Sequence, residues 1–165
     1  MADIPEYTLR PALDGDIEGL YALHVETMRG YVEATFGPWD EAHEREVYWR
    51  RWGDIQVATN RTLDVVLVGG AVAGYLDVED EGEFVALNNI RVAPSMQGRG
   101  LGGALVQRVI TEAAPRPVQL RVYKVNPAQR LYRRLGFREI EDIGTHYVMR
   151  THSDGAAHSK ASSIG

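Results

Sequence analysis

The most informative segment of this chain reads Gln97-Gly98-Arg99-Gly100-Leu101-Gly102-Gly103. It lies between a predicted strand that ends near Val92 and a predicted helix that begins near Leu101. Glycines let backbone N–H groups approach an anion closely, and a helix N-terminus adds unpaired N–H groups and the positive end of its dipole. The segment therefore predicts a cradle for a phosphate or pyrophosphate. The alternative is a tight strand-to-helix turn with nothing bound.

The residues that follow this loop narrow the choice of ligand. The spacing Gly98-x-Gly100-x-x-Gly103 matches a dinucleotide fingerprint, which also needs an acidic residue about 20 positions later to hold a ribose. No Asp or Glu occurs between residues 113 and 138, and no Gly-Lys-Ser/Thr follows the loop, which excludes a Walker-type site. That stretch instead carries basic residues, namely Arg116, Arg121, Lys124, Arg130, Arg133, Arg134 and Arg138. We therefore expect a phosphorylated ligand that is met by arginines.

Composition limits the remaining function classes. The chain has 165 residues, and 44% of them are hydrophobic. This length is typical of a single domain. It has no cysteine, which excludes disulfides, thiolate metal sites and a cysteine nucleophile. Residues 1–89 carry a net charge of −12 and residues 90–150 carry +7. This asymmetry indicates either two ligands of opposite charge or two differently solvated surfaces.

Hydrophobic periodicity and turn residues predict the order β-α-α-β-β-β-α-β-α-β-β. Asp14 is the expected N-cap of the first helix, Phe36-Gly37-Pro38 breaks that helix, and Gly69-Gly70 indicates a hairpin. The predicted strands are 7–10, 62–68, 71–78, 83–92, 117–124, 137–141 and 145–150, and the predicted later helices are 39–52, 101–113 and 126–136. This order indicates an α/β (α+β mixed) domain with a mixed, mostly antiparallel sheet flanked by helices.

The domain is expected to span residues 3–150, followed by a disordered tail at 151–165, which is small and polar. The N-terminus has no signal segment, and no apolar run approaches the roughly 20 residues of a membrane span. We therefore expect a cytoplasmic protein with no membrane partner, and the net charge of −5 disfavours a nucleic-acid partner. The histidines show no metal-ligand spacing, so no metal is expected.

Two segments together resemble the GNAT superfamily of N-acetyltransferases. Residues 89–102 read Asn-Ile-Arg-Val-Ala-Pro-Ser-Met-Gln-Gly-Arg-Gly-Leu-Gly and are similar to the family's fourth strand and its pyrophosphate loop. Residues 126–137 read Asn-Pro-Ala-Gln-Arg-Leu-Tyr-Arg-Arg-Leu-Gly-Phe and are similar to its second cofactor motif. The order of elements over residues 3–150 also agrees. The resemblance implies acetyl-CoA as co-substrate and no metal.

The resemblance also implies which residues contact acetyl-CoA. The loop amides from Gly98 to Gly103 would bind the pyrophosphate with Arg99, the strand from Ile90 to Val92 would run beside the pantetheine arm, and Asn126 would meet that arm. The amide of Val92 would polarise the thioester carbonyl. The implied cofactor contacts are Ile90, Arg91, Val92, Gln97, Gly98, Arg99, Gly100, Leu101, Gly102, Gly103 and Asn126.

Tyr132 is the implied catalytic residue, as the general acid that protonates the departing thiolate. A thiol with a pKa of about 8.5 and a tyrosine with one of about 10 make this proton transfer feasible. The alternative is a tyrosine that only packs its ring. No general base can be assigned, because Ala86 stands where some family members carry a glutamate.

Aromatic and acidic residues mark the expected acceptor region. Tyr31, Glu33, Phe36 and Trp39 are expected to line it, and together they suit a cationic or amphipathic amine. The alternative assigns the aromatic residues to the core and the glutamate to a solvated face.

The resulting hypothesis is an N-acetyltransferase that moves an acetyl group to a primary amine, of a small molecule or else of a peptide, by direct transfer in a ternary complex. Two alternatives remain. One is a CoA-binding sensor or regulatory module without turnover, and the other is an NADP-binding oxidoreductase, which the proline after the strand disfavours. A homodimer is common among resembling proteins, and the sequence leaves the oligomeric state open.

Overall fold

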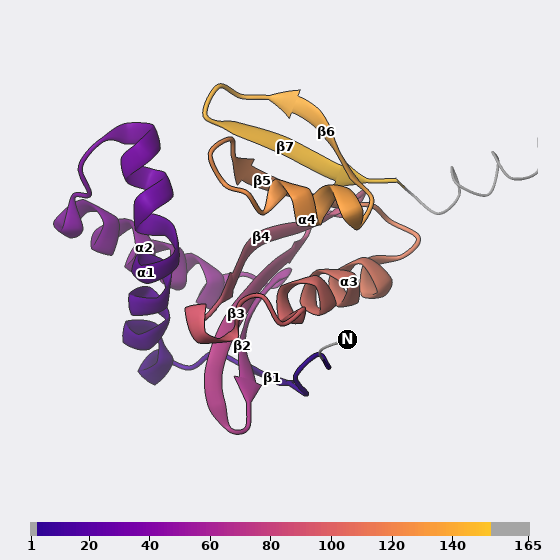
Figure 1. Cartoon of the computed structure of the whole chain (residues 1–165). Coiled ribbons are helices and arrows are strands. Elements are labelled where there is room, and N and C mark those ends of the chain that lie inside the picture. The colour runs from indigo at the N-terminus through magenta and orange to yellow at the C-terminus, as the bar shows by residue number, and fades with distance from the viewer. Residues whose placement is uncertain (1–2, 153–165) are drawn as a thin grey trace, which may run out of the picture.

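A computed structural model describes residues 3–152, which form one seven-stranded sheet with helices on both faces (Figure 1). The strands are β1 (Thr8–Pro11), β2 (Arg61–Val68), β3 (Ala71–Asp80), β4 (Val85–Val92), β5 (Val118–Tyr123), β6 (Phe137–Asp142) and β7 (His146–Thr151). The helices are α1 (Ile17–Phe36), α2 (Glu41–Val57), α3 (Leu101–Ala113) and α4 (Gln129–Arg134). Short 3-10 turns lie at Asp14–Asp16 and Pro94–Met96.

The strand order across the sheet is β1-β2-β3-β4-β5-β7-β6. The β4–β5 pair is parallel, and every other pair is antiparallel. Both the predicted order of elements and the predicted fold class, a mixed and mostly antiparallel sheet between helices, are confirmed.

The two faces of the sheet carry different helices. On one face α1 and α2 pack against β2 and β3 through a cluster that includes Leu20, Tyr48 and Val65. On the other face α3 packs on β2 and β3 through Leu105, and α3 and α4 share a larger cluster with β4, β5 and β7. Figure 1 shows these layers, with α3 and α4 lying on the side of the sheet away from α1 and α2.

The sheet opens between β4 and β5. The two strands pair only from Val85 with Val118 to Leu87 with Leu120, and beyond this point β4 continues without β5 beside it. The β3–β4 register shifts between Asp77 and Val78, which leaves Asn88 as an extra residue in β4. Such a bulge bends and twists its strand. The backbone groups on the β5 side of the open half of β4 therefore form no ladder with β5.

A buried ion pair supports β4 at this bulge. Asp77 is 1% exposed, and its carboxylate accepts hydrogen bonds from Arg61 Nε at 2.8 Å and Nη2 at 2.7 Å. The same carboxylate accepts a bond from Asn89 Nδ2 at 2.9 Å. Asn89 Oδ1 in turn accepts a bond from Arg91 Nη2 at 2.9 Å. This chain of partners holds the Asn89 and Arg91 side chains of β4 in place, because a buried carboxylate needs its acceptors filled.

Local chemistry explains most element boundaries. Gly69 and Gly70 have φ of +58° and +81° and close the predicted hairpin, since a two-residue turn of this kind needs the left-handed region twice. Helix α1 ends where predicted, at Gly37 with φ of +95°. Asn126 Oδ1 accepts a bond from the Ala128 amide at 2.9 Å, so it caps the turn that leads into α4, although the regular helix begins only at Gln129.

Three details differ from the sequence prediction. Helix α2 runs from Glu41 to Val57, five residues past the predicted end at residue 52. Asp14 does not cap α1, because it lies in the preceding 3-10 turn, where its carboxylate accepts bonds from Trp52 Nε1 and Gln56 Nε2 of α2. Strand β7 continues through Thr151, whose hydroxyl accepts a bond from the Val118 amide at 2.8 Å. The remainder of the predicted tail, from residue 153, lies outside the described residues. Within residues 3–152, no helix has the length and apolar character that crossing a membrane requires.

Candidate active site

Two cavities meet where β4 and β5 separate. The larger, of about 480 Å³, lies over the glycine loop and between α3 and α4, and is called the glycine-loop cavity here. The smaller, of about 290 Å³, lies toward α2 and is called the α2 cavity. Five residues line both of them and form their shared wall: Met28, Ile90, Arg91, Asn126 and Tyr132. Groups bound in the two cavities would therefore contact the same five side chains.

The glycine loop provides the anion-binding features that the sequence predicts. Gly98 and Gly100 have φ of +74° and +83°, a region that favours glycine. Gly100 is the N-cap of α3 and offers no side-chain acceptor, so the first amides of that helix remain free for a ligand. A Cβ atom on Gly103 would lie 3.5 Å from the Leu131 side chain of α4, an ordinary contact distance, so α3 and α4 approach each other closely at this glycine. These features fit a pyrophosphate at the start of α3.

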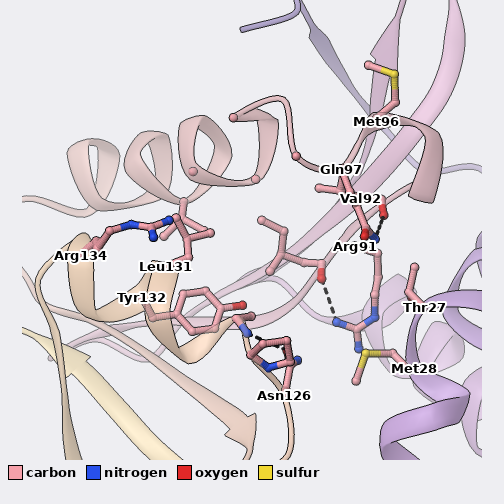
Figure 2. A pocket seen from close by; sticks show the side chains of 18 of the residues that line it. Thr27, Met28, Arg91, Val92, Met96, Gln97, Asn126, Leu131, Tyr132 and Arg134 are labelled. Carbon is pink, nitrogen blue, oxygen red and sulfur yellow. Dashed lines mark hydrogen bonds between the residues drawn. The ribbon is translucent and has the colours of Figure 1, made fainter. Parts of the chain in front are cut away.

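The open edge of β4 presents its backbone to the cavities. The Ala93 amide donates to Ala73 of β3 at 2.8 Å, so the backbone groups of Val92 and Ile90 point the opposite way. Their carbonyl oxygens accept side-chain hydrogen bonds, Val92 from Gln97 Nε2 at 3.0 Å and Ile90 from Arg91 Nη1 at 2.8 Å (Figure 2). The N–H groups of the same two residues face the open edge, where an extended ligand could pair with them.

Tyr132 extends from α4 into the shared wall (Figure 2). The residue is 8% exposed, and its ring packs edge-on against Phe137 with centroids 5.7 Å apart. Burial raises the pKa of its hydroxyl, and the positive charge of Arg91 opposes this effect. The hydroxyl therefore stays protonated at neutral pH and can act as a proton donor.

The α2 cavity contains an excess of positive charge. Arg51 of α2, Arg91 of β4 and Arg121 of β5 line it, together with one carboxylate, that of Glu44. His24 also lines it, with Nδ1 buried and without a hydrogen-bond partner among the described residues. Burial lowers the pKa of His24 to about 3, and Arg91 and Arg51 contribute further. The imidazole is therefore neutral at physiological pH.

The structure brings most of the expected cofactor residues to the glycine-loop cavity. Its lining includes Ile90, Arg91, Val92, Gln97, Gly98, Gly100, Gly102, Gly103 and Asn126. Arg99 and Leu101 do not line it. The guanidinium of Arg99 lies beside Met96 Sδ at 3.3 Å, and Leu101 is 1% exposed in the core.

Only one of the four expected acceptor residues lines either of these two cavities. Tyr31 lines the glycine-loop cavity. The other three line neither cavity: Glu33 pairs with Arg29 on the surface of α1, Phe36 is 64% exposed and packs against Tyr123, and Trp39 Nε1 donates to Glu41. Phe36 thus reaches the α2 cavity only through Tyr123, which lines it.

The sequence analysis missed several lining residues. Arg134 at the end of α4 and Thr27 and Met28 of α1 line the glycine-loop cavity, with Arg134 at the end away from Arg91 (Figure 2). Glu44 and Arg51 of α2 line the α2 cavity. The sequence signal for Arg134 was its place in the basic run after the loop. No local pattern distinguishes Glu44 or Arg51 from their exposed neighbours on the same helix.

Residues 19–137 match the family described as the Acetyltransferase (GNAT) family. The chain belongs to this family. The resemblance drawn from the two sequence segments is confirmed. An uncharacterised N-acetyltransferase of Methanocaldococcus jannaschii, MJ1207, is 28% identical to the chain over 154 residues, which is 85% of the chain and 64% of that protein. The chain therefore spans less than two thirds of this relative's length.

Solved structures share the GNAT fold seen here. An acetyltransferase from Thermus thermophilus matches 91% of the chain and 98% of its own length, with a TM-score of 0.70 and 24% identity. The PaiA N-acetyltransferase from Thermoplasma acidophilum, solved in complex with coenzyme A, matches 89% of the chain and 99% of its own length, with a TM-score of 0.69 and 13% identity. Among residues 3–152 of this GNAT protein, no group of three or more His, Asp or Glu side chains could hold a metal ion.

Proposed function

We propose that this GNAT protein transfers an acetyl group from acetyl-CoA to an amine, with both substrates bound at once. The shared wall carries this proposal, because its residues contact both cavities at the point where β4 and β5 separate. The glycine-loop cavity would take the donor, with its pyrophosphate on the amides of Gly98 to Gly103. The α2 cavity would take the acceptor.

Four groups of this chain have defined tasks in such a transfer. The amides of Ile90 and Val92 hold an extended arm along the open edge of β4. The Val92 amide also stabilises the negative charge that develops on the thioester oxygen, since a fixed donor in a dry site is effective there. Asn126 contacts the arm from the α4 side, and Tyr132 holds a proton beside the sulfur.

The chemical balance of the step is simple. The acceptor nitrogen attacks the thioester carbon, a C–N bond forms, and the C–S bond breaks. Tyr132 gives its proton to the departing thiolate, and the nitrogen loses one proton to a base. Among the described residues, Glu44 is the one Asp or Glu that lines either of the two cavities. Its carboxylate is therefore the candidate acceptor of that proton. Direct transfer is consistent with a chain that has no cysteine to carry the acetyl group.

Thiol release from acetyl-CoA tests the proposal, because the chain has no cysteine and adds no background signal. The assay is run with amino acids, short peptides, neutral amines, polyamines and aminoglycosides. We expect release that depends on one class of amine and that Glu44→Gln slows. Binding of acetyl-CoA without amine-dependent release in any class would contradict transfer and favour the sensor alternative.

A further inference from the structure

Arg51, Arg91 and Arg121 come from three different elements and line one cavity, yet none forms a salt bridge among the described residues. Arg91 lies mostly within the protein. Its Nε is buried without a partner in the described part of the chain, and its two terminal nitrogens bond only to neutral oxygens of Ile90 and Asn89. A buried guanidinium with unfilled donors is costly unless a ligand fills them.

The lack of a partner for Arg51 within residues 3–152 is informative because carboxylates are abundant in the same half of the sequence. Residues 1–89 hold 18 Asp and Glu against six arginines. The other five of those arginines pair with a carboxylate: Arg10, Arg29, Arg45, Arg50 and Arg61. Arg50 pairs with Glu46 on the outer face of α2, whereas Arg51, one position later, turns into the cavity.

The positive charge of these three arginines also affects two histidines that line the cavity. Arg91 and Arg51 both lower the pKa of His24 beyond the effect of burial, and Arg121 does the same for His146. Both histidines line the α2 cavity. A protonated imidazole or a polycation is therefore disfavoured there, whereas an anion is favoured.

We infer that the acceptor carries an anionic oxyacid group, a carboxylate or a phosphate, in addition to its amine. This inference rests on the proposed acetyl transfer and names its substrate class. Guanidinium groups suit such anions because their planar N–H pairs match two oxygens at once. Glu44, the single carboxylate among the described residues of the cavity, meets the opposite requirement, since it can hold the ammonium form of the amine before its proton leaves.

The inference departs from the sequence expectation of a cationic acceptor. That expectation used Glu33 as a charged lining residue, and Glu33 lies at the surface of α1 in an ion pair with Arg29. Three guanidinium groups against one carboxylate leave the α2 cavity with an excess of positive charge.

Matched pairs of amines provide the test. Each pair differs only in its anion: β-alanine and its amide, phenylalanine and its amide, and O-phosphoethanolamine and ethanolamine, with spermidine as the cationic probe. Binding is measured by calorimetry in the presence of CoA, and turnover by thiol release from acetyl-CoA. We expect the anionic member of a pair to bind at least about tenfold more tightly. The carboxylate and phosphate pairs then distinguish the two anions.

Arginine variants connect this preference to the cavity. Arg51→Gln and Arg121→Gln should each weaken binding of the anionic member roughly tenfold and leave its uncharged partner unchanged. Arg50→Gln is the matched control, since it removes the neighbouring charge from outside the cavity and should change neither. Arg121 is exposed, so its replacement leaves folding intact and keeps the test decisive if Arg51→Gln unfolds.

The two proposals fail in different ways. Equal or absent binding of both members of every pair overturns the inference, whatever the turnover. Thiol release with spermidine or neutral amines alone overturns it as well, but supports acetyl transfer. Anion-selective binding that both arginine variants weaken, without thiol release from any amine, supports the anion site and contradicts the proposed transfer.

Discussion

Gly74 of β3 lies so close to Arg91 of β4 that a Cβ atom at position 74 would be 2.1 Å from the Arg91 carbonyl oxygen. The contact is with backbone, which cannot rotate away as a flexible side chain can. The two strands pair here with Gly74 opposite Val92 and Tyr75 opposite Arg91. Strand β4 lines both cavities. The absence of a side chain at Gly74 therefore determines how closely this strand approaches β3.

We expect Gly74→Ala to lower the free energy of unfolding by about 2 kcal/mol or more, since an inserted methyl group must displace β4. Urea denaturation measures this. Gly53→Ala is the control, because nothing lies within 4 Å of its added Cβ in α2, and it should raise stability by about 0.5–1 kcal/mol. If Gly74→Ala unfolded at the same urea concentration as the unaltered protein, the close approach of Gly74 to the Arg91 carbonyl would be contradicted.

The elements that the sequence predicts best are those whose signals are local. Helix α3 begins at Leu101 and ends at Ala113 as predicted, because an apolar stripe follows the glycine loop directly. The β2–β3 hairpin is equally clear from Gly69-Gly70. The parts of the site that lie on these local motifs, the loop and the turn that Asn126 caps, could therefore be placed from the sequence.

The α2 cavity could not be placed, because its residues are distant in sequence and come together only through the sheet. Arg51 and Glu44 lie on a helix whose charged residues look alike in sequence, and burial alone separates Arg51 from Arg50. The bulge at Asn88 shifts the β4 pattern by one residue, which strict alternation does not anticipate. The split between β4 and β5 is likewise a property of the paired strands and not of either segment.

Arg134 is expected to contribute to donor binding. Its guanidinium lines the glycine-loop cavity at the α4 end, and a phosphorylated ligand there would accept charged hydrogen bonds from it. Arg134→Ala should raise the KM for acetyl-CoA roughly tenfold and leave kcat nearly unchanged. Arg133→Ala is the matched control, because that exposed neighbour lines neither the glycine-loop cavity nor the α2 cavity. Equal KM values for the two variants would remove Arg134 from the donor site.

His24 should make folding stability depend on pH. Its pKa is about 3 in the folded protein because of burial, with Arg91 and Arg51 adding to the effect, against about 6.5 in an unfolded chain. The unfolded state therefore binds a proton first as the pH falls. The stabilising contribution of the neutral imidazole is complete above about pH 6.5 and decreases progressively toward pH 3.

Between pH 7 and pH 4, the free energy of unfolding of His24→Leu should decrease by about 3 kcal/mol less than that of the unaltered protein. Leucine binds no proton in either state, so the variant lacks this contribution to the pH dependence. Urea unfolding at a series of pH values between about 7 and 4 measures the difference. His43→Leu on the exposed face of α2 serves as the control and should follow the unaltered protein. Parallel pH curves for the His24 variant and the unaltered protein would mean that His24 is not held neutral by its site.

Tyr132→Phe tests the proton donor without disturbing the fold. The ring packs against Phe137 and is retained in the variant, and no described residue hydrogen-bonds to the hydroxyl that is lost. Stability and the KM for acetyl-CoA should therefore change little. If the hydroxyl protonates the leaving thiolate, kcat should fall by about 100-fold or more, which is the usual contribution of a general acid.

Tyr147→Phe is the matched control for this variant, because Tyr147 lies on β7 beside the site, packs against the same core and lines neither cavity. It should keep both kcat and KM. A Tyr132→Phe enzyme whose kcat stays within about threefold of the unaltered value would mean that water, and not Tyr132, protonates the sulfur. A rise in KM with kcat unchanged would instead mean that the hydroxyl binds the donor in its ground state. Only a loss confined to kcat places the Tyr132 proton on the reaction path.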